Sequence, residues 1–176
     1  MAAGHNRRDV ITGGATALGL FLIGGKQVWA TPSDAVAQNF TPQILTLPQS
    51  KALATLAEHL VPGSAKAGIS AYIDTQLAAG PDSLLMAKYV GVPVEQQKDF
   101  YLSALNAIVS AMSDTAVEAF ATAMASDTVP QWQGPPASYV FFLLRADALD
   151  VTYGSEAGFE TLDIPYSAHI RPETTW

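Results

Sequence analysis

Apolar residues recur at intervals of three and four along most of the chain after residue 48, which is the spacing of one face of an α-helix. Five helices and one short helix or turn are predicted in this way: between Pro48 and Pro62, over about 69–79, around 83–89, from Pro93 to Met112, after the capping pair Ser113-Asp114, and from about 136 to 150. The last of them carries its large apolar side chains on one side, at Tyr139, Phe142, Leu143, Ala146 and Leu149.

Proline and glycine bound these segments and leave short connections between them. Pro62-Gly63 and Gly80-Pro81 end the first two helices, and residues 151–176 have an irregular pattern. No segment alternates apolar and polar residues over the length expected of a half-buried strand. The predicted fold class is therefore all-α, a small irregular bundle of about five to six helices that follows an N-terminal signal segment.

Residues 1–30 have the pattern of an export signal rather than of a folded element. Arg7 and Arg8 precede an uncharged run over 10–25, and small residues place a cleavage site after Ala30. The run is too short to cross a bilayer, which takes about 20 apolar residues. We therefore predict that residues 1–30 direct export and lie outside the folded domain.

The adjacent arginines resemble the signal of the twin-arginine pathway, which exports folded proteins. Val10, Ile11 and Thr12 stand where the usual twin-arginine pattern has Phe-Leu-Lys. A general secretory signal that happens to hold two basic residues is the alternative interpretation. On the first interpretation the twin-arginine translocase is an expected partner and the protein is periplasmic.

Two further parts of the chain follow the predicted signal. Residues 31–48 are polar and interrupted by Pro32, Pro42 and Pro48, so they are predicted to be a linker or docking segment. Residues 49–176 hold the helical patterns and form the predicted domain. The chain has 176 residues, about the length of one domain, and no internal repeat is visible.

Composition excludes several classes of chemistry. The chain has no cysteine, so it has no disulfide, no thiol nucleophile, no cysteine-ligated zinc or iron–sulfur cluster, and no covalent haem. Removing residues 1–30 takes Arg7, Arg8, Lys26 and Asp9 from the 9 basic and 16 acidic side chains, which leaves 6 and 15 and a net charge of about −9. An acidic domain is a poor nucleic-acid binder, since such proteins neutralise phosphates with a basic surface.

Motifs for phosphate and metal binding are weak. The glycines over 14–26 superficially resemble a P-loop, but they lack its Gly-Lys-Ser/Thr ending and lie in the predicted signal. His59 follows Glu58 without an H-E-x-x-H motif, and its place near the end of the first helix suits a cation at the helix dipole. We therefore expect no cofactor and no metal in this chain.

Candidate catalytic groups are few. Asp147 and Asp150 are three residues apart on the last predicted helix, where we expect them to be solvated or to pair with Arg145 or a neighbouring residue. An enzyme would use His59 or His169 with a carboxylate, and no G-x-S-x-G elbow is present. Catalysis by this chain alone is thus a minor alternative.

Aromatic residues in proline-rich segments are better candidates for contact with a partner. Trp132 lies in the loop over 129–136, where core packing and interface anchoring are both open to it. Tyr166 and Trp176 lie in the irregular C-terminal part. These three side chains are the candidate partner-binding residues.

Three stretches, in order along the chain, resemble subunit 3 of the gluconate 2-dehydrogenase family. They are LATLAEHLVP over 53–62, AGISAYIDTQLA over 67–78, and FFLLRADALD over 141–150. A twin-arginine leader is also typical of this family. Each stretch is ordinary helical sequence, so the resemblance rests on all of them together.

The resemblance implies a non-catalytic small subunit of a membrane-associated, FAD-dependent sugar or polyol dehydrogenase. In that family a flavoprotein large subunit oxidises the substrate and a multihaem cytochrome c subunit carries the electrons. The small subunit holds no cofactor, binds the flavoprotein, supports its maturation and supplies the export signal for the pair. FAD and haem c are thus expected in partner subunits, and a stand-alone exported binding or scaffold module is the alternative function.

Overall fold

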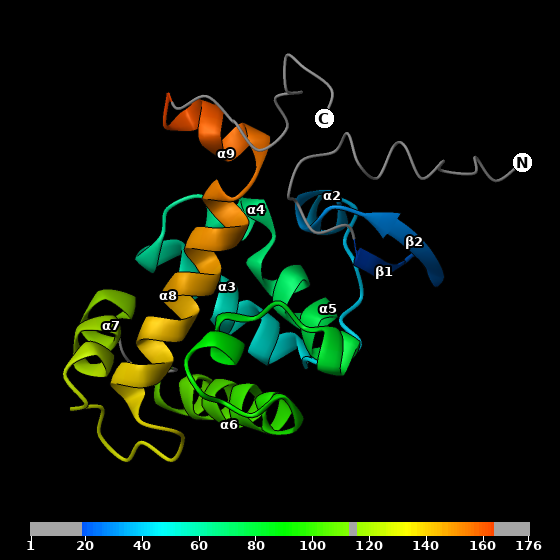
Figure 1. Ribbon diagram of the computed structural model, residues 1–176. Coiled ribbons are helices and arrows are strands. Elements are labelled where there is room, and N and C mark those ends of the chain that lie inside the picture. Colours follow the sequence, from blue (N-terminus) through cyan, green and yellow to red (C-terminus); the bar gives the residue numbers. More distant parts are fainter. Residues whose placement is uncertain (1–18, 113–115, 164–176) are drawn as a thin grey trace, which may run out of the picture.

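The computed structural model describes residues 19–112 and 116–163. These residues are mainly helical and include one two-stranded antiparallel sheet, so the predicted helical fold class is confirmed (Figure 1). The α-helices are α2 (Pro32–Ala37), α3 (Leu47–Leu60), α4 (Ser64–Ala67), α5 (Ile69–Ala79), α6 (Val94–Met112), α7 (Val117–Ala125), α8 (Ala137–Tyr153) and α9 (Glu156–Thr161). The remaining elements are β1 (Gly19–Ile23), β2 (Lys26–Ala30) and two 3₁₀ turns, η1 (Gly80–Asp82) and η2 (Met86–Tyr89).

The main core lies between the five longer helices α3, α5, α6, α7 and α8. In Figure 1, α8 runs lengthwise through the molecule, α6 crosses below it, and α7 and α5 flank it. The largest fully buried side chains of this core come from all five helices and from the segment before η2: Leu53, Leu56, Ile69, Ile73, Leu85, Tyr101, Leu105, Ile108, Phe120, Met124 and Leu143. The apolar spacing therefore identified the buried faces of α3, α5, α6 and α7, whereas α8 buries only Leu143 of the five residues of its predicted face.

Local capping explains where the helices begin. Thr46 and Gln49 form a capping box, in which the Thr46 hydroxyl accepts the Gln49 N–H and the Gln49 side chain accepts the Thr46 N–H. At α8 the Asp127 carboxylate accepts the backbone N–H of Ser138 at 2.7 Å. The predicted cap at Ser113-Asp114 lies outside the described residues.

Residues 151–163 contain more helix than their irregular pattern predicts. Helix α8 continues three residues past Asp150 to Tyr153, and α9 follows after Gly154. Ser155 caps α9, because its side chain accepts the backbone N–H of Gly158 at 3.1 Å. This short serine-capped turn was too brief for helical spacing to reveal it.

A β-hairpin occupies residues 19–30, although the sequence pattern predicts part of an export signal and no strands there. Gly19 pairs with Ala30 at one end, and Gly24 and Gly25 form the turn at the other with φ of 56° and 75°. A two-residue turn with positive φ at both positions matches the twist of a hairpin and suits glycine. A second, smaller core fixes the hairpin to the helices and consists of Phe21, Ala30, Ala35 and Ala71.

Residues 31–48, predicted to be a linker or docking segment, are folded against the domain. Helix α2 begins after the capping residue Thr31. Asp74 of α5 then accepts the backbone N–H groups of Gln43, Ile44 and Leu45 at 2.8–2.9 Å. One buried carboxylate thus replaces the regular hydrogen-bond partners that this proline-interrupted segment lacks.

Candidate functional site

An apolar stripe on the outer side of α8 is the first component of the candidate site. Phe142 and Leu149 are 52% and 39% exposed, and Ala146 between them is half-buried. Spacings of four and three residues place these side chains on one face of the helix. Phe142 and Leu149 were expected to share the inner side of the helix with Leu143, but only Leu143 of the three is buried.

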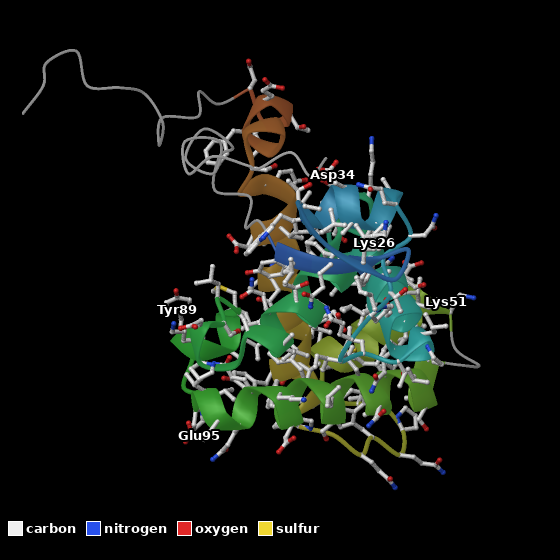
Figure 2. The ribbon with its side chains drawn as sticks, turned by 90° about the vertical axis from the view of Figure 1, so that its right-hand side faces the viewer. Lys26, Asp34, Lys51, Tyr89 and Glu95 are labelled. Atoms are coloured by element: carbon white, nitrogen blue, oxygen red, sulfur yellow. The ribbon has the colours of Figure 1, made fainter. Side chains whose placement is uncertain are left out.

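Tyr89 and Val90, at the end of η2, lie beside the first turn of α8 and enlarge this apolar surface. The Tyr139 hydroxyl donates to the carbonyl of Val90 at 2.9 Å, which fixes the end of the segment beside the first turn of α8. Tyr89 is 66% exposed. We call the combined surface the α8 apolar face: Tyr89, Val90, Tyr139, Phe142, Ala146 and Leu149. In the view of Figure 2, Tyr89 lies on the opposite side of the molecule from Lys51.

Asp147 lies on the inner side of α8 and supports this face from beneath. Its Oδ1 accepts the backbone N–H of Met86 at 2.9 Å, and its Oδ2 accepts the Tyr101 hydroxyl at 2.6 Å. The side chain is fully buried. Asp147 therefore joins α8, α6 and the segment that carries Tyr89.

Burial controls the titration of these groups. It raises the pKa of Asp147 from 3.8 to about 7, although the hydrogen bonds from Met86 and Tyr101 favour the ionised form and lower it. Burial also raises the pKa of Tyr101 far above 10, and the adjacent Asp147 carboxylate adds to that effect. The pair is therefore a neutral phenol that donates to a carboxyl group whose charge changes near neutral pH.

Asp150 forms a second, outer link between α8 and α5. The Tyr72 hydroxyl donates to Asp150 Oδ2 at 3.5 Å, a long hydrogen bond. Burial, followed by the charge of Asp150, raises the pKa of Tyr72 above its ordinary value. The prediction that both aspartates are solvated or pair with Arg145 or a neighbouring residue is wrong for Asp147, which is buried and accepts a hydrogen bond from Tyr101, 46 positions away.

This cluster of carboxyl and phenol groups is arranged for structure. A carboxyl group with a shifted pKa marks a catalytic candidate when it lies in a cleft. Asp147 has no exposed surface, and each of its oxygens is occupied by a donor from within the chain. Its chemical contribution is to hold α6, α8 and η2 at fixed separations.

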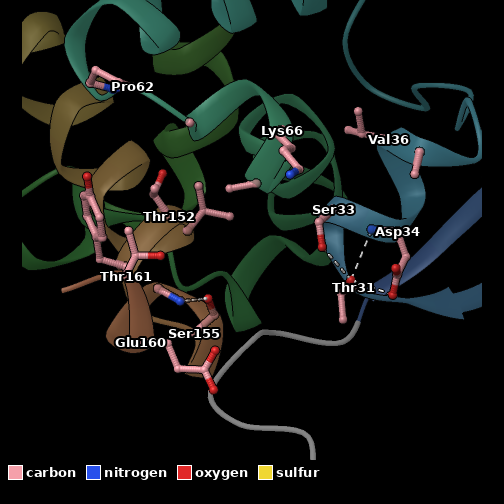
Figure 3. A pocket seen from close by; sticks show the side chains of 16 residues that line it. Thr31, Ser33, Asp34, Val36, Pro62, Lys66, Thr152, Ser155, Glu160 and Thr161 are labelled. Carbon is pink, nitrogen blue, oxygen red and sulfur yellow. Dashed lines mark hydrogen bonds between the residues drawn. The ribbon is translucent and has the colours of Figure 1, made fainter. Parts of the chain in front are cut away.

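An open cleft of about 880 Å³ lies elsewhere, between α2, α4 and the α8–α9 junction. In Figure 3, Thr31 and Ser33 of one wall lie across from Ser155 and Glu160 of the other. Lys66 adds one cation to the lining, and apolar residues such as Val36 supply most of the rest. The cleft has hydroxyl groups to bind a polar ligand, but Asp147 does not line it.

The structure places the sequence-predicted site residues in different regions. Arg7, Arg8, Tyr166, Trp176 and His169 lie outside the described residues. Ala30 is the last residue of β2 and is buried, while His59 is exposed in the last turn of α3. Of the two histidines considered for catalysis, the structure thus describes His59 but not His169.

Trp132 is half-buried rather than free in its loop. Its indole N–H donates to the Pro135 carbonyl at 2.6 Å, and its ring packs against the main core. Gly134 fits closely against this ring, because a Cβ there would lie 3.2 Å from it. Much of the Trp132 ring is therefore used within the chain, and its contact with a partner stays a prediction.

The residues 19–112 and 116–163 hold no group of three or more histidine, aspartate or glutamate side chains placed to bind a metal ion. Within the same ranges, no helix combines the length and the apolar character of a membrane span. No family model, curated protein or solved structure matches this chain.

The buried aspartates could have been found from spacing. Val140, Leu143, Leu144, Asp147 and Val151 follow one another at helical intervals, so Asp147 stands among core positions. Asp74 stands in the same way between Ile73 and Leu77. An acidic residue in the middle of an apolar face signals a buried carboxylate that has hydrogen-bond donors.

Proposed function

We propose that this chain is the non-catalytic small subunit of an exported, FAD-dependent sugar or polyol dehydrogenase complex. Its α8 apolar face binds the flavoprotein large subunit, and a multihaem cytochrome c subunit completes the complex at the membrane. One observation carries the proposal above all. Helix α8, which holds the family-like stretch over 141–150, also exposes Phe142 and Leu149 to solvent.

The exposed side chains of this face are suited to a protein partner. Complete burial of a leucine or phenylalanine side chain is worth about 1.5–3 kcal/mol, and these two are partly exposed, so about half of that value remains for each. Aromatic side chains such as Phe142 and Tyr89 are the kind that dominate interface hot spots. The face can therefore supply a compact apolar centre for an interface.

Charged groups border the face. Arg145 and Asp150 are both exposed on α8, with Arg145 between Phe142 and Leu149 along the helix. Interfaces commonly have such a polar rim around an apolar centre. Because Asp147 fixes the helix and the η2 segment beneath, little ordering is left for the binding step.

The export role rests on Arg7 and Arg8, which lie outside the described residues. Two guanidinium groups present fixed and permanently charged donor forks, which lysine reproduces poorly. The double variant Arg7→Lys/Arg8→Lys is expected to keep both this chain and the flavoprotein in the cytoplasm. Normal export of the flavoprotein with that variant would contradict the escort role.

Copurification tests the subunit assignment directly. The full chain, tagged at its C-terminus, would be isolated from its native host in mild detergent, and the eluate would be examined by mass spectrometry and by flavin and haem absorbance. A flavoprotein in near-equal amount is the expected result. A colourless eluate without a partner would overturn the proposal and favour the stand-alone binding module.

A matched pair of variants tests the binding face. Phe142→Asp places a charge in the apolar centre and is expected to lose the flavoprotein from the eluate. Leu47→Asp is the control, because Leu47 is 73% exposed at the start of α3, one turn before Lys51. In the view of Figure 2, Lys51 lies on the side away from Tyr89. Equal flavoprotein recovery with both variants would remove the α8 apolar face from the proposal.

A further inference from the structure

We infer that residues 19–30 remain in the exported protein as a structural hairpin, so that signal peptidase does not cut after Ala30. Any processing of the chain then lies before Gly19. The inference rests on the proposed export for its biological setting, but its structural basis is independent of the flavoprotein.

Burial of Phe21 is the first observation. This side chain is 1% exposed, and it packs with Ala35 of α2 and Ala71 of α5 in the smaller core. Its ring meets the ring of Phe40 edge-on, with 6.2 Å between centroids and planes at 80°. A signal segment that is cleaved off has no need of a phenylalanine side chain buried in the core of the mature domain.

The candidate cleavage site itself is folded, which is the second observation. Ala30 is 7% exposed and pairs with Gly19, and the next residue, Thr31, caps α2 through a hydrogen bond from the Asp34 N–H at 3.1 Å. Proteases cut exposed and mobile segments most readily. The peptide bond after Ala30 instead joins a paired strand to a capped helix.

A third observation ties the hairpin to the segment that follows. The backbone N–H of Thr41 donates to the carbonyl of Leu22 at 2.7 Å. Two residues later, Asp74 begins to hold the chain at Gln43. The segment over 41–43 is therefore hydrogen-bonded to β1 at one end and to α5 at the other.

Loss of the hairpin would open the smaller core, which is the fourth observation. A cut after Ala30 would remove Phe21 from its place between α2 and α5 and expose Ala35 and Ala71, which are fully buried. Retention keeps the smaller core complete.

Intact mass of the exported chain is the first test. The full-length chain would be produced in its native host, recovered from the periplasmic fraction and weighed by mass spectrometry. The expected mass includes residues 19–30. A mature chain that begins anywhere from residue 20 to residue 31 would overturn the inference while leaving the proposed export intact.

A pair of variants of the full chain tests the structural role without export. Phe21→Ala is expected to lower the thermal unfolding midpoint by about 5 °C or more, since it empties a buried aromatic site. Trp29→Ala is the control, because Trp29 lies on the same hairpin and is 61% exposed, and its midpoint is expected to change by less than about 1 °C. Equal midpoints for Phe21→Ala and the wild type would overturn the inference.

The two measurements separate the possible failures. If no chain reaches the periplasm, the proposed export fails, and the unfolding midpoints still decide whether the hairpin belongs to the fold. If the exported chain retains residues 19–30 and Phe21→Ala is destabilised, both the proposed export and the retained hairpin are supported.

Discussion

Tyr101 of α6 donates its hydroxyl hydrogen to Asp147 of α8 at 2.6 Å inside the main core, although the two residues are 46 positions apart in the sequence. The other Asp147 oxygen accepts the Met86 N–H. A single carboxyl group thus fixes two helices and the segment that carries Tyr89. Its protonation state should therefore affect the stability of the whole domain.

The titration of Asp147 predicts a specific dependence of stability on pH. Burial raises its pKa in the folded protein from 3.8 to about 7, so the folded state holds a proton that the unfolded state releases between these values. The stability that this group contributes is complete below about pH 4 and is lost as the pH rises through about 7. Relative to Asp147→Asn, the wild type should lose up to about 4 kcal/mol of unfolding free energy over that range.

Urea unfolding of the wild type and Asp147→Asn between pH 4 and pH 8 measures this difference. Asparagine keeps an acceptor for Met86 and does not titrate, so the variant reports the other ionisable groups, including Asp150. Parallel stability curves for the two proteins would show that Asp147 titrates as an ordinary carboxyl group.

Removal of the Tyr101 hydroxyl should leave Asp147 with one unsatisfied oxygen. Tyr101→Phe is expected to lower the unfolding free energy at pH 7 by about 1–3 kcal/mol, the usual cost of orphaning a buried polar group. Tyr139→Phe is the control, because its hydroxyl bonds the Val90 carbonyl in an exposed setting and should cost less. Chemical denaturation provides both values, and an equal loss for the two would contradict the central role of Asp147.

Asp74 predicts a local effect on the segment before α3. Asp74→Asn leaves one acceptor oxygen where the carboxylate served three N–H groups, so the amides of Gln43, Ile44 and Leu45 should exchange with solvent faster. Hydrogen exchange followed by mass spectrometry resolves this segment from the core helices. The exposed Asp82 provides the control variant, Asp82→Asn, which should leave exchange at 43–45 unchanged.

Gly68 predicts a steric effect where α2 meets the α4–α5 junction. Its φ is 96°, and a Cβ there would overlap the backbone carbonyl group of Pro32. Gly91 has a similar φ of 93° with open space around it. Gly91→Ala should therefore cost about 1–2 kcal/mol for the backbone conformation alone, and Gly68→Ala clearly more. Thermal unfolding of the two variants separates the steric clash with Pro32 from the cost of a positive φ in alanine. Equal losses of stability for the two variants would mean that α2 does not pack against Gly68.

Helices were predictable because their signals are local. Pro48, Pro62-Gly63 and Gly80-Pro81 mark helix ends through backbone chemistry that tertiary contacts rarely override. The apolar spacing then located the core faces of α3, α5, α6 and α7. These signals act within one or two helical turns, so the sequence displays them directly.

The hairpin was hidden for a physical reason. Residues 19–30 are apolar on nearly every position, and an apolar run near two arginines has the features of an export signal. The pair Gly24-Gly25, which separates the apolar stretch over 19–23 from residues 26–30, is also a hairpin signal. Its strands acquire a buried side only through contact with α2 and α5, which no local pattern contains.

The candidate site was predictable only in part. The pattern of α8 located Phe142 and Leu149 on one helix, but only the packing of η2 beside Asp147 determines which side meets solvent. The links from Tyr101 to Asp147 and from Tyr72 to Asp150 join residues 46 and 78 positions apart. Such pairings depend on how helices meet, which apolar spacing does not specify.

Helix α5 is a wall shared by two cores, with Ala71 facing the smaller one and Ile69 and Ile73 facing the main one. The smaller core consists of four buried side chains, so far less apolar surface holds the hairpin than holds the helices. The domain should therefore unfold in two stages on heating or in denaturant, in which the hairpin side of α5 is exposed to solvent first, and the midpoint that Phe21→Ala lowers is that of this first stage. Until the hairpin docks, the side of α5 that carries Ala71 is exposed to solvent. Folding of this protein is therefore complete only when residues 19–30 have packed against α2 and α5.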